Sequence, residues 1–324
     1  DVVPADGYTA PPIGRTWYDT NGDSIQAHGG GFLQHEGWYY WIGENKAHDR
    51  AVLNAVSLYR SQDLLNWEHV NDIVTTETAG VCDTGTYTGE ECKIERPKLL
   101  FNAATQQFVM WGHWETADSY AASKVIVATS DTIDGDYEVQ DIFRPGVGEV
   151  TTEHEDPTYE GTDGLWGYGS RDFTVFKDPD SDAAYLFSTE DHENMRVYRL
   201  TDDYTDVVLE SSYRLFAGGH REAPAVVKID GRYFVMTSGQ SGWYPNQTRV
   251  GSTTDLSDPD GWSDLSLVGN NSSFYSQPTN IITVEGDGGE RSYLYMGDRW
   301  NSKKLGTSTY VWLPLEIDGT DVSL

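Results

Sequence analysis

The sequence predicts an all-β fold, and within that class a five-bladed β-propeller, from three observations. The 324 residues show almost no helical periodicity. Short aromatic and β-branched runs are bounded by Gly, Asp, Asn and Pro, which is typical of strands and turns. One pattern of strands recurs five times at spacings of roughly 50 to 75 residues, a period typical of propeller blades.

The recurring unit opens with a hairpin, in which an apolar strand and a polar turn precede a strand that starts on an aromatic or hydrophobic residue. The five hairpins are expected at residues 32–44, 99–114, 173–190, 225–239 and 281–298. A third strand is expected to begin near Ser57, Val125, Val197, Arg249 and Thr309. A turn and an outer strand complete each unit. Because no low-complexity linker divides the chain, we expect one domain over residues 1–324; a β-sandwich with chance similarity among its hairpins is the alternative.

Charge excludes several function classes. The 22 Lys and Arg residues against 52 Asp and Glu residues leave a net charge of −30. Binding to nucleic acid or to anionic lipid is therefore not expected, since both need clustered cationic side chains. No apolar run approaches the roughly 20 residues that span a bilayer. The 11 Trp and 20 Tyr residues suit stacking on sugar faces, although β-rich secreted proteins also use many aromatics in their cores.

Two cysteines lie close together in a Gly- and Thr-rich stretch. Cys82 and Cys92 therefore predict one disulfide that closes a short loop, with two free thiols as the alternative. The sequence begins at Asp1 with no signal peptide, which we interpret as the mature form of a secreted protein.

Polar residues stand on or just before the first strand of each unit, where an apolar residue would be expected. The innermost strands of a propeller run along its axis, so these side chains should meet near one end of it. They are Gln26, His28, Glu95, Asp172, Glu222 and Gln277. A buried charge is costly unless it is paired. Arg96, Arg171 and Arg221 each adjoin one of the three acids in sequence. Neighbours along a strand point to opposite faces, so we expect these arginines to pair with acids of other blades.

Several carboxylates at one end of a closed β-structure suggest cleavage of glycosidic bonds. That reaction needs a proton donor on the leaving oxygen and a group that stabilises an oxocarbenium-like centre. The donor must keep its proton near neutral pH, which burial or a nearby negative charge achieves. Asp172 close to Glu222 would provide that charge. The alternative is that these acids bind calcium or cap strand ends.

Segments from every unit resemble family 43 glycoside hydrolases, and most of all their exo-β-1,3-galactanase subgroup. The segments are IQAHGGGF, YYWIGENK, IERPKLLFN, SRDFTVFKD, REAPAVVK, TSGQSGWYPNQ, SQPTN and YVWLPLEI. The resemblance runs from about Ile13 to Glu316 and implies a five-bladed propeller that inverts the anomeric centre.

The resemblance implies a role for each catalytic candidate. Glu222 matches the general acid, and Asp172 matches the carboxylate that raises the pKa of the acid and orients it. Most of the family uses a first-blade Asp as the general base. In this chain the corresponding stretch, IQAHGGGF, contains no acidic residue. Asp23 precedes it in the sequence NGD, which is typical of a turn. In the galactanase subgroup Gln277 would act on the water as an imidic-acid tautomer. Glu95 matches a further important carboxylate, and its action on the water, directly or through Gln277, is the alternative.

Sugar binding is expected from a second group of side chains. They are Gln26, His28, Glu44, Tyr120, Glu190 and Trp243, with Asn194 and Trp300 as weaker candidates. Glu44 and Glu190 end apolar strands, where a carboxylate can accept bonds from hydroxyl groups; solvated strand ends are the alternative. Ordinary packing is the alternative for the aromatic residues, and a place at the axis near water or an ion is the alternative for His28. His192 and His220 are given no role.

The predicted activity is hydrolysis of β-1,3-linked galactan, such as an arabinogalactan backbone, from the non-reducing end. Two alternatives stay open: another family 43 glycosidase (β-galactofuranosidase, α-L-arabinofuranosidase or β-xylosidase), and a galactan-binding propeller without catalysis. No organic cofactor and no catalytic metal are expected. A structural calcium ion is compatible with the resemblance, although the DPDSD stretch at residues 178–182 is explained as a hairpin turn. A monomer is expected.

Overall fold

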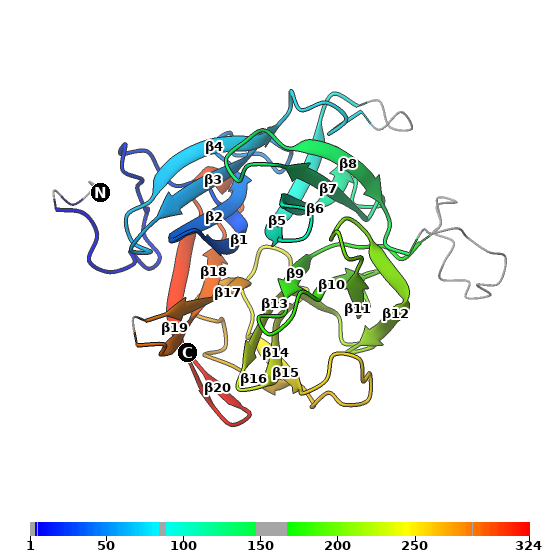
Figure 1. Cartoon of the computed structure of the whole chain (residues 1–324). Coiled ribbons are helices and arrows are strands. Elements are labelled where there is room, and N and C mark those ends of the chain that lie inside the picture. Colours follow the sequence, from blue (N-terminus) through cyan, green and yellow to red (C-terminus); the bar gives the residue numbers. More distant parts are fainter. Residues whose placement is uncertain (1–3, 5, 84–88, 147–166, 287) are drawn as a thin grey trace.

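The computed structural model describes residues 4, 6–83, 89–146, 167–286 and 288–324. It contains five four-stranded antiparallel sheets that surround a central axis (Figure 1). Within each sheet the strands pair in sequence order. The predictions of an all-β fold and of five propeller blades are confirmed.

Each blade starts at the axis and ends at the periphery. The innermost strands are β1 (His28–His35), β5 (Cys92–Asn102), β9 (Phe173–Lys177), β13 (Arg221–Ile229) and β17 (Gln277–Glu285). The second strands are β2 (Trp38–Asn45), β6 (Gln107–Thr116), β10 (Ala184–Glu190), β14 (Arg232–Gly239) and β18 (Arg291–Arg299). The third strands are β3 (Ala55–Ser61), β7 (Lys124–Ser130), β11 (Asn194–Leu200), β15 (Arg249–Thr253) and β19 (Thr309–Asp318). The outer strands are β4 (Glu68–Thr75), β8 (Glu138–Phe143), β12 (Val207–Leu215), β16 (Ser266–Leu267) and β20 (Asp321–Ser323).

Helix is almost absent from the described ranges. They contain one short 3₁₀ helix, Leu305–Thr307. No helix in the described part of the chain has the length and apolar character needed to cross a bilayer.

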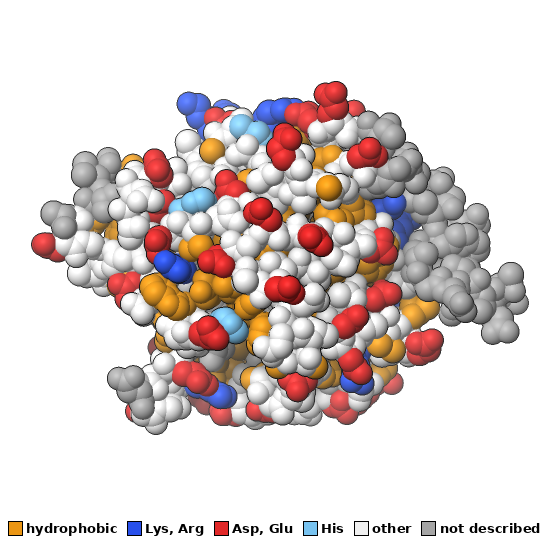
Figure 2. All heavy atoms as spheres, turned by 45° about the horizontal axis from the view of Figure 1, so that its top comes forward, with side chains coloured by type: hydrophobic (Ala, Val, Ile, Leu, Met, Phe, Trp, Pro, Cys, Tyr) orange, Lys and Arg blue, Asp and Glu red, His pale blue; other side chains and the backbone are white. Residues whose placement is uncertain are grey.

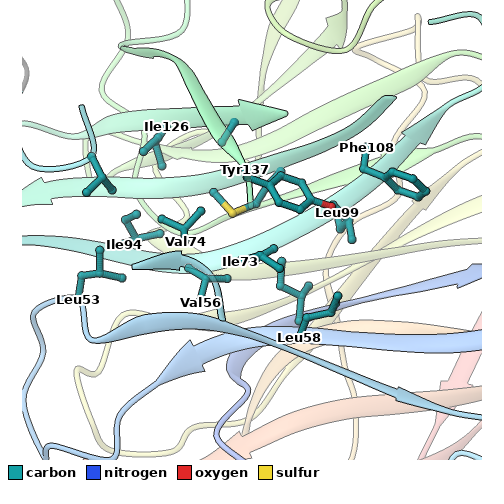
Figure 3. Packing of buried hydrophobic residues seen from close by; sticks show 14 of the residues in the cluster. Leu53, Val56, Leu58, Ile73, Val74, Ile94, Leu99, Phe108, Ile126 and Tyr137 are labelled. Atoms are coloured by element: carbon teal, nitrogen blue, oxygen red, sulfur yellow. The ribbon is translucent and has the colours of Figure 1, made fainter. Parts of the chain in front are cut away.

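Five hydrophobic clusters form the core, and each lies between two adjacent blades. Side chains alternate between the two faces of a strand, so each sheet packs against a neighbour on both sides. Figure 3 shows one cluster, in which Leu53, Val56 and Ile73 of the first blade meet Ile94 and Leu99 of the second. This packing explains why the inner strands read as nearly continuous apolar runs.

Aromatic packing joins the last blade to the first, since no strand is exchanged between these sheets. The ring of Trp41 lies 4.6 Å from that of Tyr310 and 4.8 Å from that of Trp312. The hydroxyl of Tyr310 also donates to the carbonyl oxygen of Ile25 at 2.8 Å. Six tryptophans are fully buried: Trp17, Trp41, Trp67, Trp111, Trp114 and Trp312. Most of the tryptophan content therefore serves packing and not sugar binding.

The acidic balance of the sequence is present on the folded surface. Figure 2 shows Asp and Glu side chains spread over one face, with few Lys or Arg among them. Such a surface repels polyanions, because like charges raise the free energy of association.

Cys82 and Cys92 form a disulfide, as predicted, and both are buried in the cluster between the first two blades. Replacing both by Ala is expected to lower the free energy of unfolding by about 2–3 kcal/mol, because the unfolded chain regains loop entropy. Denaturant unfolding of the purified variant would measure this change. An unchanged midpoint and slope would contradict a stabilising role.

Candidate active site

A cavity of about 350 Å³ lies at one end of the axis and takes side chains from all five blades. The lining includes eight residues that the sequence had singled out: Glu44, Glu95, Tyr120, Asp172, Glu222, Trp243, Gln277 and Trp300. It also includes six residues that had not been proposed for the site: Arg96, His113, Arg171, Thr189, His192 and Gly242. The four predicted catalytic residues therefore line one cavity, although up to 182 positions separate them in sequence.

Two β-bulges direct the acidic side chains into this cavity. The register of β5 shifts after Glu95, and that of β13 shifts after Glu222. The next residue has a left-handed backbone in both cases, with φ of 53° at Arg96 and 50° at Ala223. A bulge changes the direction of a side chain beside a functional site. The proline that follows each of these residues has no N–H to leave unpaired.

Arg96 joins three blades through a buried guanidinium. One nitrogen lies 3.1 Å from Asp172 Oδ2 and donates to Gln277 Oε1 at 2.6 Å, and the other donates to the carbonyl oxygen of Pro278 at 3.1 Å. Its backbone N–H donates to Glu44 Oε1 at 3.0 Å. Pairing of an acid with an arginine across blades is therefore present, as expected.

Glu222 has the environment that a proton donor needs. Burial, followed by the negative charge of Asp172, raises the pKa of Glu222 to about 8. A carboxyl group with this pKa is mostly protonated at neutral pH and can act as a general acid. Its Oε1 also accepts a hydrogen bond from Gln277 Nε2 at 3.0 Å.

The orientation of the Gln277 amide follows from its partners. Oε1 accepts from Arg96 at 2.6 Å and from the indole N–H of Trp300 at 3.0 Å. Both groups only donate, so the atom that faces them must be the oxygen. Nε2 donates to Glu222 and to Ser238 Oγ at 3.0 Å each. An imidic-acid tautomer protonated on oxygen would lose one of the two donors, so the contacts favour the ordinary amide.

Glu95 is held as an anion. Burial alone would raise its pKa, but contacts with His113 outweigh burial and, together with a hydrogen bond from Tyr120, lower the pKa to about 2. Tyr120 Oη donates to Glu95 Oε1 at 2.7 Å. A base with so low a pKa takes a proton poorly near neutral pH. Direct proton abstraction by Glu95 is therefore disfavoured, whereas accepting hydrogen bonds from sugar hydroxyls is not.

Aromatic rings form one wall of the cavity. Trp243 and Trp300 meet edge to face with ring centroids 5.4 Å apart. Trp243 is 42% exposed, which leaves its ring free to contact a ligand. The same two tryptophans also line an adjoining cavity of about 230 Å³.

Two predicted sugar-binding residues of the first blade do not line the cavity. Gln26 is buried, where its amide donates to Gly306 O at 2.9 Å and accepts from Lys46 N at 3.1 Å. His28 is fully buried and stacks on Tyr310 at a centroid distance of 5.0 Å. The expectation of sugar contact is wrong for both in this structure, because both pack inside the fold.

Glu190 also lies away from the cavity, contrary to the prediction. Its carboxylate is fully buried and pairs with Arg196 at 2.7 Å and Arg214 at 2.9 Å, within its own blade. The weaker candidate Asn194 is buried as well and accepts from Gly218 N at 2.9 Å. Both side chains serve structure. The sequence places both residues at strand ends, but it does not show whether such a side chain faces a cavity or is paired inside the fold.

His192, which had been given no role, lies at the rim of the cavity. His113 is the more informative omission, since it lies opposite Glu95 in the β5–β6 pairing. The alternation of His113 and Glu115 along one face of β6 was a signal in the sequence. Interpreting it required the strand register, which the sequence does not display.

One set of three side chains in the described part of the chain could hold a metal ion. The ligand atoms of Glu95, His113 and Asp172 lie within 4.8 Å of one another. They already face charged partners, including Arg96 at 3.1 Å from Asp172. Burial lowers the pKa of His113, but its carboxylate partners, Glu115 first, outweigh burial and raise it to about 9, so a metal would have to displace a proton. We assign the set to an ion-pair network and not to a metal site.

One known protein family matches most of this chain. The sequence profile described as glycosyl hydrolases family 43 matches residues 31–311. Among curated proteins none matches this chain.

Several solved structures are similar over nearly the whole chain. An exo-β-1,3-galactanase of Clostridium thermocellum is 41% identical over 96% of this chain and 64% of that one, with a TM-score of 0.85. An exo-β-1,3-galactanase of Phanerochaete chrysosporium, solved with galactose, is 34% identical over 96% and 66%, with a TM-score of 0.81. A family 43 β-1,3-galactosidase solved with galactodeoxynojirimycin is 32% identical over 96% and 98%, with a TM-score of 0.81. The chain thus spans less than two thirds of the first two proteins.

Proposed function

The chain belongs to glycosyl hydrolase family 43, and from this premise we propose that it is an exo-β-1,3-galactanase that removes galactose from the non-reducing end of β-1,3-galactan with inversion. The similarity to galactanase structures at 34% and 41% identity supports this substrate. Galactan chains such as an arabinogalactan backbone are the proposed partners.

The observation that carries the proposal is the setting of Glu222. Its carboxyl group keeps a proton at neutral pH because it is partly buried beside Asp172. In the proposed reaction Glu222 gives this proton to the glycosidic oxygen while one water bonds to the anomeric carbon. The attacking water gives up its proton to solvent on the opposite face of the sugar, and Glu222 regains a proton from solvent after the leaving sugar departs, so the net change consumes one water per bond.

Substrate must separate Gln277 from Glu222 for this reaction to occur. In an inverting enzyme the attacking water lies on the face of the sugar opposite the acid, and acid and base stand roughly 6.5–9.5 Å apart. Here Gln277 Nε2 lies 3.0 Å from Glu222 Oε1. We expect a bound galactose to replace this hydrogen bond, after which the Gln277 amide orients the water.

The rest of the cavity suits recognition of one sugar. Glu95 offers an anionic oxygen for hydroxyl groups, and Glu44 offers a second buried carboxylate. Trp243, Trp300 and Tyr120 supply aromatic surface, and sugar faces pack well on rings of this kind. A cavity filled by a terminal galactose would produce exo action.

Asp172 should control the pH range of the reaction. Because the acid must be protonated, kcat/KM falls as the pH rises through the pKa of Glu222, about 8. Replacing Asp172 by Asn removes a charge that raises this pKa, so the alkaline limb should move to lower pH. Measuring kcat/KM on a β-1,3-galacto-oligosaccharide across roughly pH 5 to 9, a range that spans the ionisation of the acid, tests this. A folded variant with an unmoved limb would contradict the role of Asp172.

The proposed function is tested with purified protein and β-1,3-galactan. We expect free galactose as the only early product, and little release from arabinoxylan or from aryl α-L-arabinofuranosides, β-xylosides and β-galactofuranosides. Galactan binding without galactose release would identify a non-catalytic propeller instead. Release of arabinose or xylose would identify another glycosidase.

The reaction as proposed uses only groups of this chain, so no organic cofactor and no catalytic metal are included. We further propose that the protein acts as a secreted monomer. Disulfides persist mainly in oxidising compartments, which supports secretion.

A further inference from the structure

We propose that His113 and Glu115 are positioning residues that keep Glu95 ionised and aligned for the sugar. Neither residue has been placed in the reaction so far. They lie on β6, and His113 stands directly opposite Glu95 of β5. The inference rests on the proposed function only in the test that measures activity.

The imidazole of His113 lies between two carboxylates. Its Nε2 lies 2.9 Å from Glu115 Oε1, and its Nδ1 lies 3.5 Å from Glu95 Oε2. A neutral imidazole has one nitrogen that donates and one that bears a lone pair. With carboxylates on both sides, the neutral ring would turn a lone pair toward one anion. Only the protonated ring presents N–H to both.

Burial and two contacts hold the Glu115 carboxylate in place beside His113. Its side chain is fully buried, and its Oε1 also accepts the backbone N–H of Ser123 at 3.0 Å. Glu115 and His113 are two residues apart on one strand, so their side chains share a face. A buried carboxylate without a cation nearby is costly. The Glu115 carboxylate and the His113 cation therefore stabilise each other within the fold.

Other charged or titratable groups surround His113 from several elements. They are Glu95 on β5, Glu115 on β6, Tyr120 after β6, Arg171 and Asp172 before β9, and His192 after β10. The charge of Arg171 favours the neutral imidazole, whereas the three carboxylates favour the cation; burial lowers the pKa of His192, so that ring adds little positive charge at neutral pH. Glu115 and Glu95 lie 2.9 and 3.5 Å from the two ring nitrogens, and these two carboxylates outweigh burial and favour the cation.

Protonated His113 in turn acts on Glu95. It stabilises the carboxylate from one side, while the hydroxyl of Tyr120 donates from the other at 2.7 Å. Glu95 thereby keeps its charge at acidic pH and a fixed direction into the cavity. Without the cation, Glu95 would take up a proton near the ordinary pH range of a glutamate and lose capacity to accept bonds from hydroxyl groups.

The direct test needs no substrate. In ¹⁵N NMR, both ring nitrogens of His113 should stay protonated from about pH 5 to 8 in the wild type, with the signal assigned by its loss in His113→Gln. In Glu115→Gln the ring should instead titrate within this range. An ordinary midpoint near about 6.5 in the wild type would overturn the proposal.

The second test is the pH profile. His113→Gln should lose about threefold or more in kcat/KM between about pH 7 and about pH 4 relative to the wild type, because a Glu95 with an ordinary pKa is then mostly protonated. A loss by the same factor at every pH would mean a structural role only. His69→Gln removes a histidine that pairs with Asp72 at 3.1 Å on the outer strand of the first blade, and it should leave the profile unchanged. Failure of the wild type to release galactose would refute the proposed function and leave the NMR test intact.

Discussion

Replacing Glu222 by Gln is expected to lower kcat on β-1,3-galactan by about 10²- to 10⁴-fold, with little change in KM. Gln keeps the shape of the side chain and its contact with Gln277, but it has no proton to give to the leaving sugar. The loss should therefore fall on the chemical step. Initial rates of galactose release from galactan, with circular dichroism to verify folding, measure it.

An aryl galactoside with a very acidic phenol sharpens this test. Such a leaving group departs without protonation, so Glu222→Gln should lose far less activity on it than on galactan. Glu68→Gln, which changes an exposed carboxylate paired with Arg60, serves as the matched control and should retain full activity. Equal losses on both substrates, or none, would remove Glu222 from the role of the acid.

Replacing Arg96 by Met is expected to lower the free energy of unfolding by about 3–5 kcal/mol, since buried carboxylates then lose their cation. The guanidinium is buried and contacts Asp172 and Gln277 in two other blades. Activity should fall as well, because both partners lose their alignment. Urea unfolding of the variant against the wild type gives the change in stability.

Two further variants separate charge from packing at this position. Arg60→Met breaks a partly exposed ion pair with Glu68 and should cost less than about 1 kcal/mol. In the double variant Arg96→Met with Asp172→Asn, neither charge remains, so some of the lost stability should return. Additive losses in the double variant would show that the two charges do not interact.

Most of the fold could be predicted because a propeller repeats its signal. Each hairpin combines an apolar inner strand with a polar turn, and all five hairpins fall where the periodic pattern put them. The closure of the ring was not foreseen. It depends on Trp41, Tyr310 and Trp312, which meet only after the first and last blades are brought together.

The site was only partly predictable, for a geometric reason. Glu95 and Glu222 precede the apolar stretches of β5 and β13, and the bulges that follow them aim both side chains into the cavity. The same pattern applied to His28, yet His28 stacks on Tyr310. Glu190 was expected to bind sugar because it ends an apolar strand, yet it pairs with two arginines of its own blade. A sequence shows which residues stand at strand ends, but not the neighbours that surround them.

The anomeric form of the first galactose released tests the account most directly. A protonated Glu222 facing one sugar, with water attacking from the opposite face, converts a β-linkage into α-galactose in a single displacement. Proton NMR of the wild type on a β-1,3-galacto-oligosaccharide should therefore show α-galactopyranose first, with the β-anomer appearing only by slow mutarotation. Initial formation of β-galactopyranose would mean a covalent intermediate on a second carboxylate and would contradict the mechanism.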